Sequence, residues 1–158
     1  MNKQEVSSVL ELSNTFDPKT LNQIISKKKE FREVKFDGEE LKLAEKYRNG
    51  EIKLEDLANM DWKYFHTAAS IYKHNGLIEL EKHDEYLKKA LMIYETILDI
   101  YNYKNDSALL PKKKRCLDSL GEVHYYLGNY EKAQEYFCEA LKEDENYWSC
   151  YHLFLVLY

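Results

Sequence analysis

Residues 117–140 read LDSLGEVHYYLGNYEKAQEYFCEA, and they carry the strongest structural pattern in the chain. Small and apolar residues recur at helical spacing on both sides of the Gly128-Asn129 dipeptide, at Leu117, Leu120, Gly121, Ala133, Phe137 and Ala140. This spacing predicts two antiparallel helices joined by a turn at the glycine. A helix pair of this kind cannot bury its apolar face alone, so it must stack on neighbouring helices.

The helical period continues through most of the remaining sequence. Asp37 is expected to cap a helix that stops at Asn49-Gly50. Asp61 is expected to cap a helix that closes at Asn75-Gly76 and whose apolar face begins at Trp62. An apolar stripe that begins at Leu87 and ends at Tyr101 predicts a long helix after that. There is no alternation of strand and helix patterns, so the predicted fold class is all-α.

Residues 114–147 resemble a tetratricopeptide repeat, which is a helix–turn–helix unit of about 34 residues. The family pairs Leu-Gly in its first helix with Ala-x-x-x-Phe in its second, and this chain has Leu120-Gly121 and Ala133-x-x-x-Phe137. Leu117 and His124 replace the tryptophan and tyrosine that the family usually has. The resemblance implies helix–turn–helix repeats that stack as a short α-solenoid.

A degenerate copy of the same unit is expected at residues 62–101. There Ala68-Ala69 matches the Leu-Gly pair, and Ala90-x-x-x-Tyr94 matches the second helix. The expected organisation is a helical N-terminal region, a degenerate helix pair, a linker, a repeat and a C-terminal capping or interface helix, at residues 1–60, 61–101, 102–111, 112–147 and 148–158.

In the tetratricopeptide family the first helix of each repeat lines a concave surface. The resemblance therefore implies a partner-binding groove built from the helices at 62–75, 112–127 and 148–158. Its expected lining residues are Lys63, His66, Ser70, Lys73, Arg115, Asp118, Glu122, Tyr125, Tyr126 and His152. For each of these residues an ordinary solvated helix face is the alternative interpretation.

Two features of this groove suggest its preference for ligands. Tyr125 and Tyr126 would serve as aromatic anchors. The cations Lys63, Lys73 and Arg115 would decide which ligand charge is preferred. Asp118 and Glu122 occupy positions at which chaperone-binding repeats carry Lys and Asn, and they would repel a C-terminal carboxylate. Binding of chaperone tails is therefore disfavoured.

Composition excludes several other classes of function. The formal net charge of −5 opposes broad binding of nucleic acid or of anionic membranes. The three cysteines form no C-x-x-C pair, which favours reduced thiols in a cytoplasmic protein. No apolar leader segment is found, and the longest apolar run, at 151–158, is much shorter than the ~20 residues of a membrane span.

No sequence pattern for catalysis or metal binding was found. The five histidines include no pair at i, i+4, and there is no H-E-x-x-H, no G-x-S-x-G and no phosphate-binding glycine loop. We therefore expect no catalytic residues, no metal site and no cofactor. The leading hypothesis is a cytoplasmic adaptor that binds a protein or peptide, and not an enzyme.

Alternatives remain open at this stage. The acidic residues Glu135, Glu139, Glu143, Asp144 and Glu145 could let the chain act as an inhibitor or sensor that blocks an enzyme or a nucleic-acid-binding protein. The basic run at 112–115 could serve an acidic partner or nucleic acid, although a solvated helix start is the simpler interpretation. The apolar run at 151–158 is expected to cap the array, to form an interface for self-association (a homo-oligomer) or for a partner, or to continue into a longer repeat array.

Overall fold

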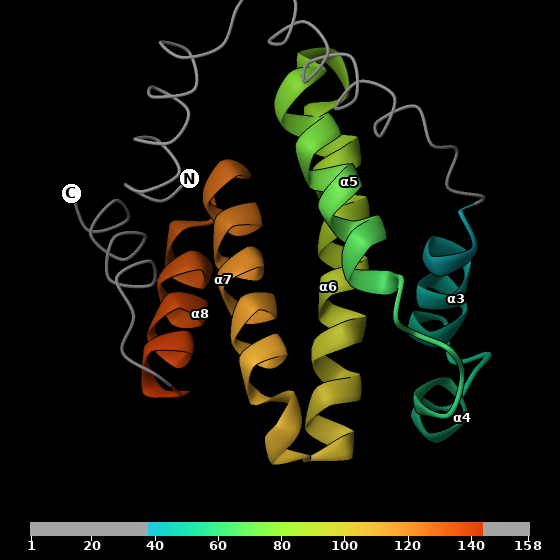
Figure 1. The fold of residues 1–158 in the computed structure, drawn as a ribbon. Coiled ribbons are helices and arrows are strands. Elements are labelled where there is room, and N and C mark those ends of the chain that lie inside the picture. Colours follow the sequence, from blue (N-terminus) through green and yellow to red (C-terminus); the bar gives the residue numbers. More distant parts are fainter. Residues whose placement is uncertain (1–37, 144–158) are drawn as a thin grey trace, which may run out of the picture. The chain divides into compact units, whose positions relative to one another are not determined.

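We describe residues 38–143 of the computed structural model, and residues 1–37 and 144–158 lie outside the described part. Within that part the chain forms helices and turns and no strand, so the all-α prediction is confirmed. The α-helices are α3, α4, α5, α6, α7 and α8 (Figure 1), at Glu39–Arg48, Leu54–Ala58, Phe65–Ile78, His83–Lys104, Leu110–Tyr126 and Tyr130–Glu143. Short 3₁₀ turns at Leu80–Lys82 and Ser107–Leu109 precede α6 and α7.

Helices α5 to α8 form two antiparallel pairs that stack on each other (Figure 1). Helix α5 packs on α6 and α7 packs on α8, while contacts between α6 and α7 join the two pairs. The side chains buried in this part of the fold include Phe65, Leu87, Ile93, Tyr94, Ile97, Leu117, Leu120, Val123 and Phe137. The predicted stacking of helix pairs is therefore confirmed, and burial of the apolar stripes supplies its driving force.

Gly121 allows the Phe137 side chain of α8 to lie close against the backbone of α7. A Cβ atom built on Gly121 would lie 2.3 Å from the Phe137 Cε1 atom, which is far inside van der Waals contact. Ala133 and Ala140 are fully buried on the facing side of α8. Leu-Gly and Ala-x-x-x-Phe thus pair for a steric reason, because the glycine leaves the space that the ring fills.

Three expected helix boundaries were wrong. Helix α5 begins at Phe65, and Asp61 does not cap it; the Asp61 carboxylate instead accepts a hydrogen bond from the Lys63 N–H at 3.3 Å. Gly76 does not end α5, which continues to Ile78. A Cβ at Gly76 would lie 3.1 Å from the Leu87 Cγ atom, so this glycine permits close packing of α6.

The third boundary is the start of α3. Its N-cap is Gly38 in the left-handed conformation, with φ of 68°, and the expected cap Asp37 lies outside the described residues. The expected end of this helix at Asn49-Gly50 is confirmed. Between α6 and α7 the non-α segment covers residues 105–109, where the sequence pattern indicated 102–111, because α6 continues to Lys104. The division of the chain into domains stays a prediction.

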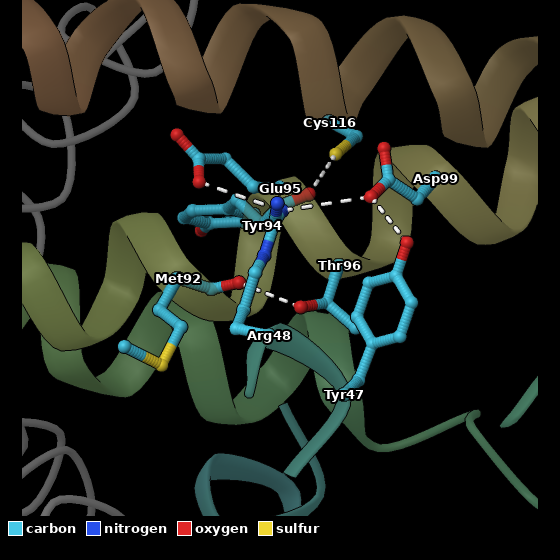
Figure 2. Close-up of polar contacts among 8 residues, drawn as sticks. All are labelled: Tyr47, Arg48, Met92, Tyr94, Glu95, Thr96, Asp99 and Cys116. Atoms are coloured by element: carbon cyan, nitrogen blue, oxygen red, sulfur yellow. Dashed lines mark hydrogen bonds and ion pairs between the residues drawn. The ribbon is translucent and has the colours of Figure 1, made fainter. Parts of the chain in front are cut away.

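Helix α6 holds α3 through polar contacts (Figure 2). The Arg48 guanidinium lies 3.4 Å from a Glu95 carboxylate oxygen and 3.7 Å from one of Asp99. The Tyr47 hydroxyl donates to the same Asp99 oxygen at 2.8 Å. From α7, the Cys116 thiol donates to the Tyr94 carbonyl at 3.3 Å. Helix α6 is thus contacted by both neighbours, although half-exposed ion pairs add at most about 1 kcal/mol each.

His83 connects the C-terminal parts of α5 and α7, which are the first helices of the two pairs. Its Nδ1 atom lies 2.8 Å from the Gly76 carbonyl in α5, and its Nε2 atom lies 3.1 Å from the Tyr126 carbonyl in α7. Carbonyl oxygens only accept, so both nitrogens can donate at once only in the imidazolium form. The bonds to Tyr126 and Gly76 accordingly raise the pKa of His83. In its charged form His83 therefore connects α5 to α7 through both hydrogen bonds.

Candidate functional site: a groove between α5 and α7

A cavity of about 500 Å³ lies where the start of α5, the second half of α6 and the start of α7 meet. Its lining residues are Met60, Asp61, Trp62, Lys63, His66, Ile97, Tyr101, Leu109, Lys112 and Arg115. This volume falls within the range of ordinary ligand pockets, roughly 300–1,000 Å³. Helix α5 begins only at Phe65, so the non-helical residues 60–63 before it form one wall of the cavity.

The floor of the cavity is apolar and aromatic. Ile97 and Tyr101 are buried side chains of α6, and the Trp62 ring meets the Tyr101 ring edge-on with centroids 5.6 Å apart. Burial raises the pKa of Tyr101 to about 12, so its hydroxyl keeps its proton at neutral pH. The floor therefore offers an uncharged surface for an aliphatic or aromatic group.

The rim of the cavity is basic. Lys63, Lys112 and Arg115 are all exposed, and none of the three forms an ion pair within residues 38–143. The Lys63 ammonium lies 4.7 Å from the centroid of the Tyr64 ring, a cation–π distance. Asp61 is the single carboxylate among the lining residues. The rim thus presents more positive than negative charge to a ligand.

His66 lies between this rim and the core. Its ring packs edge-on against Tyr94 with centroids 5.5 Å apart, and its Nε2 atom is buried with no hydrogen-bond partner among the described residues. Burial, and then the positive charges of Lys73 and Arg115, lower the pKa of His66. His66 is therefore neutral at pH 7, and the electrostatic potential at its ring is positive.

Lys73 and Glu122 pair with each other across the groove. The Lys73 Nζ atom lies 2.9 Å from a Glu122 carboxylate oxygen, and the lysine side chain is 10% exposed. Burial acts to lower the pKa of Lys73, but the adjacent carboxylate outweighs it and raises the pKa. This ion pair joins α5 to α7, and each of the two residues partly neutralises the charge of the other.

The other residues expected in the groove lie further along the helices. Ser70 is half-buried near the Tyr94 hydroxyl. That hydroxyl is buried and forms no hydrogen bond of good geometry with Ser70 or with any other described residue. Asp118 is half-buried on α7, one turn after Arg115. His152, like Val156, lies outside the described residues.

The two tyrosines at the end of α7 lie away from the cavity. The Tyr125 ring contacts both the Tyr126 ring and the Tyr130 ring, each with centroids 5.6 Å apart. Ten residues of helix separate Arg115 from Tyr125, which corresponds to roughly 15 Å. The structure therefore brings Lys63, His66 and Arg115 together at one cavity, and it leaves Tyr125 and Tyr126 at the other end of the groove.

Residues 67–144 match the family model of the tetratricopeptide repeat. Residues 67–144 thus form a tetratricopeptide-repeat region. The match begins within α5 and covers all of α6, α7 and α8, so it includes both helix pairs except the first two residues of α5. No curated protein and no solved structure matches the chain. Tetratricopeptide-repeat proteins are typically scaffolds without enzymatic activity, and their repeats generally mediate protein–protein interactions.

The tetratricopeptide match starts after the residues that form one wall of the cavity. Met60, Trp62 and Lys63 all precede it, so this wall is a feature of this chain beside the repeats. Sequence reasoning assigned Trp62 and Tyr101 to the helix core and therefore missed them as lining residues. One sequence pattern indicated the basic rim. Lys112 belongs to a basic run at the start of a helix, where positive charge is unfavourable.

Neither a membrane-spanning helix nor a metal site is found in the described part of the chain. Between residues 38 and 143, no helix has the length and apolar character that crossing a membrane requires. In the same range, no three His, Cys, Asp or Glu side chains are placed to hold a metal ion.

Proposed function

We propose that the chain is an adaptor that binds a protein or peptide partner in the groove between α5 and α7. The observation that carries this proposal is the cavity at the start of the two helices, where an apolar floor is surrounded by cations. A cavity with an apolar floor and a few polar groups suits one anchoring side chain of a partner, and the rest of the groove can contact the flanking residues.

The packing of the groove supports a rigid binding site. The Lys73–Glu122 ion pair and the two His83 hydrogen bonds hold α5 and α7 at a fixed separation. A preformed surface loses little conformational freedom when a ligand binds, so the entropic cost falls mainly on the partner. A standard interface needs roughly 800 Å² from each partner, which the groove and its flanking helices could supply.

The proposal includes the remaining features of the leading hypothesis. We propose that the chain has no catalytic activity of its own, and the described residues that line the cavity include no Ser, Thr or Cys nucleophile. Action in the cytoplasm is part of the same proposal and is supported by Cys116 and Cys138, the two cysteines within residues 38–143, which form no disulfide there. Self-association through residues 148–158 stays a prediction about a segment outside the described residues.

A substitution that fills the cavity tests the site. Met60 and Leu110 are both 41% exposed, but only Met60 lines the cavity. We expect a protein captured from cell extract by the wild-type chain to be retained by Leu110→Trp and lost from Met60→Trp. Circular dichroism of each variant would establish that both remain folded. Equal retention by all three chains would refute the groove as the binding site.

One alternative has a specific observation in its favour. Glu131, Glu135 and Glu139 are exposed at successive i, i+4 positions of α8, which gives a column of carboxylates. Such a surface could block a nucleic-acid-binding protein by charge mimicry. Glu135→Gln/Glu139→Gln would then abolish capture of the partner, and added salt would release the partner from the wild-type chain.

A further inference from the structure

We propose that the ligand of the cavity is an acidic segment of a partner protein, which places one aliphatic or aromatic side chain on the cavity floor and its acidic neighbours against Lys63, Lys112 and Arg115. This inference rests on the proposed groove function and names the chemistry of the partner. The three cations come from two separate parts of the chain, the segment before α5 and the first turns of α7.

The first argument is charge complementarity. The whole chain has a net charge of −5, yet the cavity rim holds three cations and one carboxylate. Lys112 and Arg115 are spaced i, i+3, so they share one face of α7. Lys112 stands in the first turn of α7, where the helix dipole disfavours cations. Helix stability therefore does not explain Lys112, whereas attraction of a negative ligand does.

The second argument is the pairing state of the cations. Lys73 already forms an ion pair with Glu122, but no carboxylate within residues 38–143 pairs with Lys63, Lys112 or Arg115. The positive potential of this region extends inward, because the charges of Lys73 and Arg115 help to lower the pKa of His66 after burial. A ligand that carries carboxylates would supply the missing partners.

The third argument is the apolar floor, which separates an acidic peptide from a nucleic acid. Ile97, Tyr101 and Trp62 offer a surface for one side chain, within about 500 Å³. A protein that binds nucleic acid through roughly six to ten phosphate contacts needs an extended basic surface. A rim of three cations around a small apolar cavity fits a short acidic peptide better.

The test uses peptides as the ligand. The probe is fluorescein-labelled Gly-Asp-Glu-Asp-Phe-Glu-Asp-Glu-Gly, and binding to the full chain is measured by fluorescence anisotropy in 50 mM NaCl. Two control peptides replace either the six acidic residues by Lys or the Phe by Ser, and a twelve-nucleotide oligo(dT) controls for simple anion binding. We expect the probe to bind at least roughly tenfold more tightly than each of the three controls, because only the probe satisfies both rim and floor.

Matched variants locate the site. We expect Lys63→Gln/Lys112→Gln/Arg115→Gln to weaken binding of the probe by roughly tenfold or more. The control Lys42→Gln/Lys88→Gln/Lys142→Gln removes the same charge from exposed lysines that do not line the cavity, and binding should change less than about twofold. Arg115→Gln alone should weaken binding by a few-fold, which keeps the test valid should the triple variant lose its fold.

The outcomes separate this inference from the proposed function. Equal loss of binding in the two triple variants, tight binding of oligo(dT), or no binding of the probe would each overturn the acidic-peptide assignment. The groove proposal would still stand if Met60→Trp, but not Leu110→Trp, lost a captured partner. Retention of the captured partner by Met60→Trp would instead overturn the groove itself, and the acidic-peptide assignment with it.

Discussion

Replacing Gly121 by alanine tests the packing that defines the second helix pair. A Cβ atom at this position would lie 2.3, 2.5 and 2.7 Å from three carbon atoms of the Phe137 ring. Carbon atoms in contact prefer separations of about 3.5–4.0 Å, so the ring or the helix must move by roughly 1 Å or more. Phe137 is 1% exposed and Leu120 beside the glycine is fully buried, so the ring has little room to retreat.

The size of the effect follows from two opposing contributions. Alanine is favoured over glycine in a helix interior by about 1 kcal/mol. Overpacking of a buried site costs about 1–3 kcal/mol and sometimes more, and a contact this short belongs at the upper end. We therefore expect Gly121→Ala to lower the free energy of unfolding by about 1–2 kcal/mol.

Urea denaturation followed by circular dichroism at 222 nm measures this change, and a double-mutant cycle identifies its cause. In a Phe137→Leu background the ring atoms are absent, so Gly121→Ala should be neutral or stabilising by up to about 1 kcal/mol. Gly76→Ala is the matched control, because its Cβ would lie 3.1 Å or more from its neighbours. That variant should stay within about 1 kcal/mol of the wild type. An equal cost of Gly121→Ala in both backgrounds would refute the steric explanation.

Three further predictions follow from other contacts. Lys73→Met and Glu122→Gln should each cost about 1–2 kcal/mol in urea denaturation, and the double variant should cost less than their sum, because each single change leaves a partly buried group without its partner. His83 has a raised pKa, so its contribution is complete below its unfolded pKa of about 6.5 and is lost as pH rises through the folded value. The stability difference between wild type and His83→Gln should therefore be larger at pH 5.5 than at pH 8.5; a difference independent of pH would contradict the double hydrogen bond. Cys116 is fully buried and burial raises its pKa, so a thiol reagent should label the half-buried Cys138 before Cys116, as read by mass spectrometry.

The helix pairs could be predicted from sequence because their signals are local. Apolar residues at helical spacing need burial wherever the helix lies, and the pairing of Leu120-Gly121 with Phe137 reflects one close contact. Boundaries were less certain because one residue can satisfy two local structures. Asp61 can cap a helix or accept a hydrogen bond from the backbone N–H two residues later. Only the packed structure shows that it does the second.

The binding site was harder to predict because it depends on contacts between distant residues. Lys73 and Glu122 are 49 residues apart, and the distance between them depends on how α5 and α7 pack. The cavity also depends on the three-residue delay in the start of α5, which turned Trp62 from an expected core residue into part of the wall. Lys63, His66 and Arg115 were nevertheless identified, because the family resemblance indicated which helices face the groove.

Site-specific photo-crosslinking tests the central claim most directly. Tyr64 and Tyr130 are 52% and 55% exposed, but Tyr64 lies beside the cavity and Tyr130 lies at the Tyr125 end of the groove. Each is replaced in turn by p-benzoylphenylalanine, and the chain is irradiated with its captured partner. The account predicts a covalent adduct with the partner from position 64 and none from position 130. An adduct from position 130 alone would contradict it.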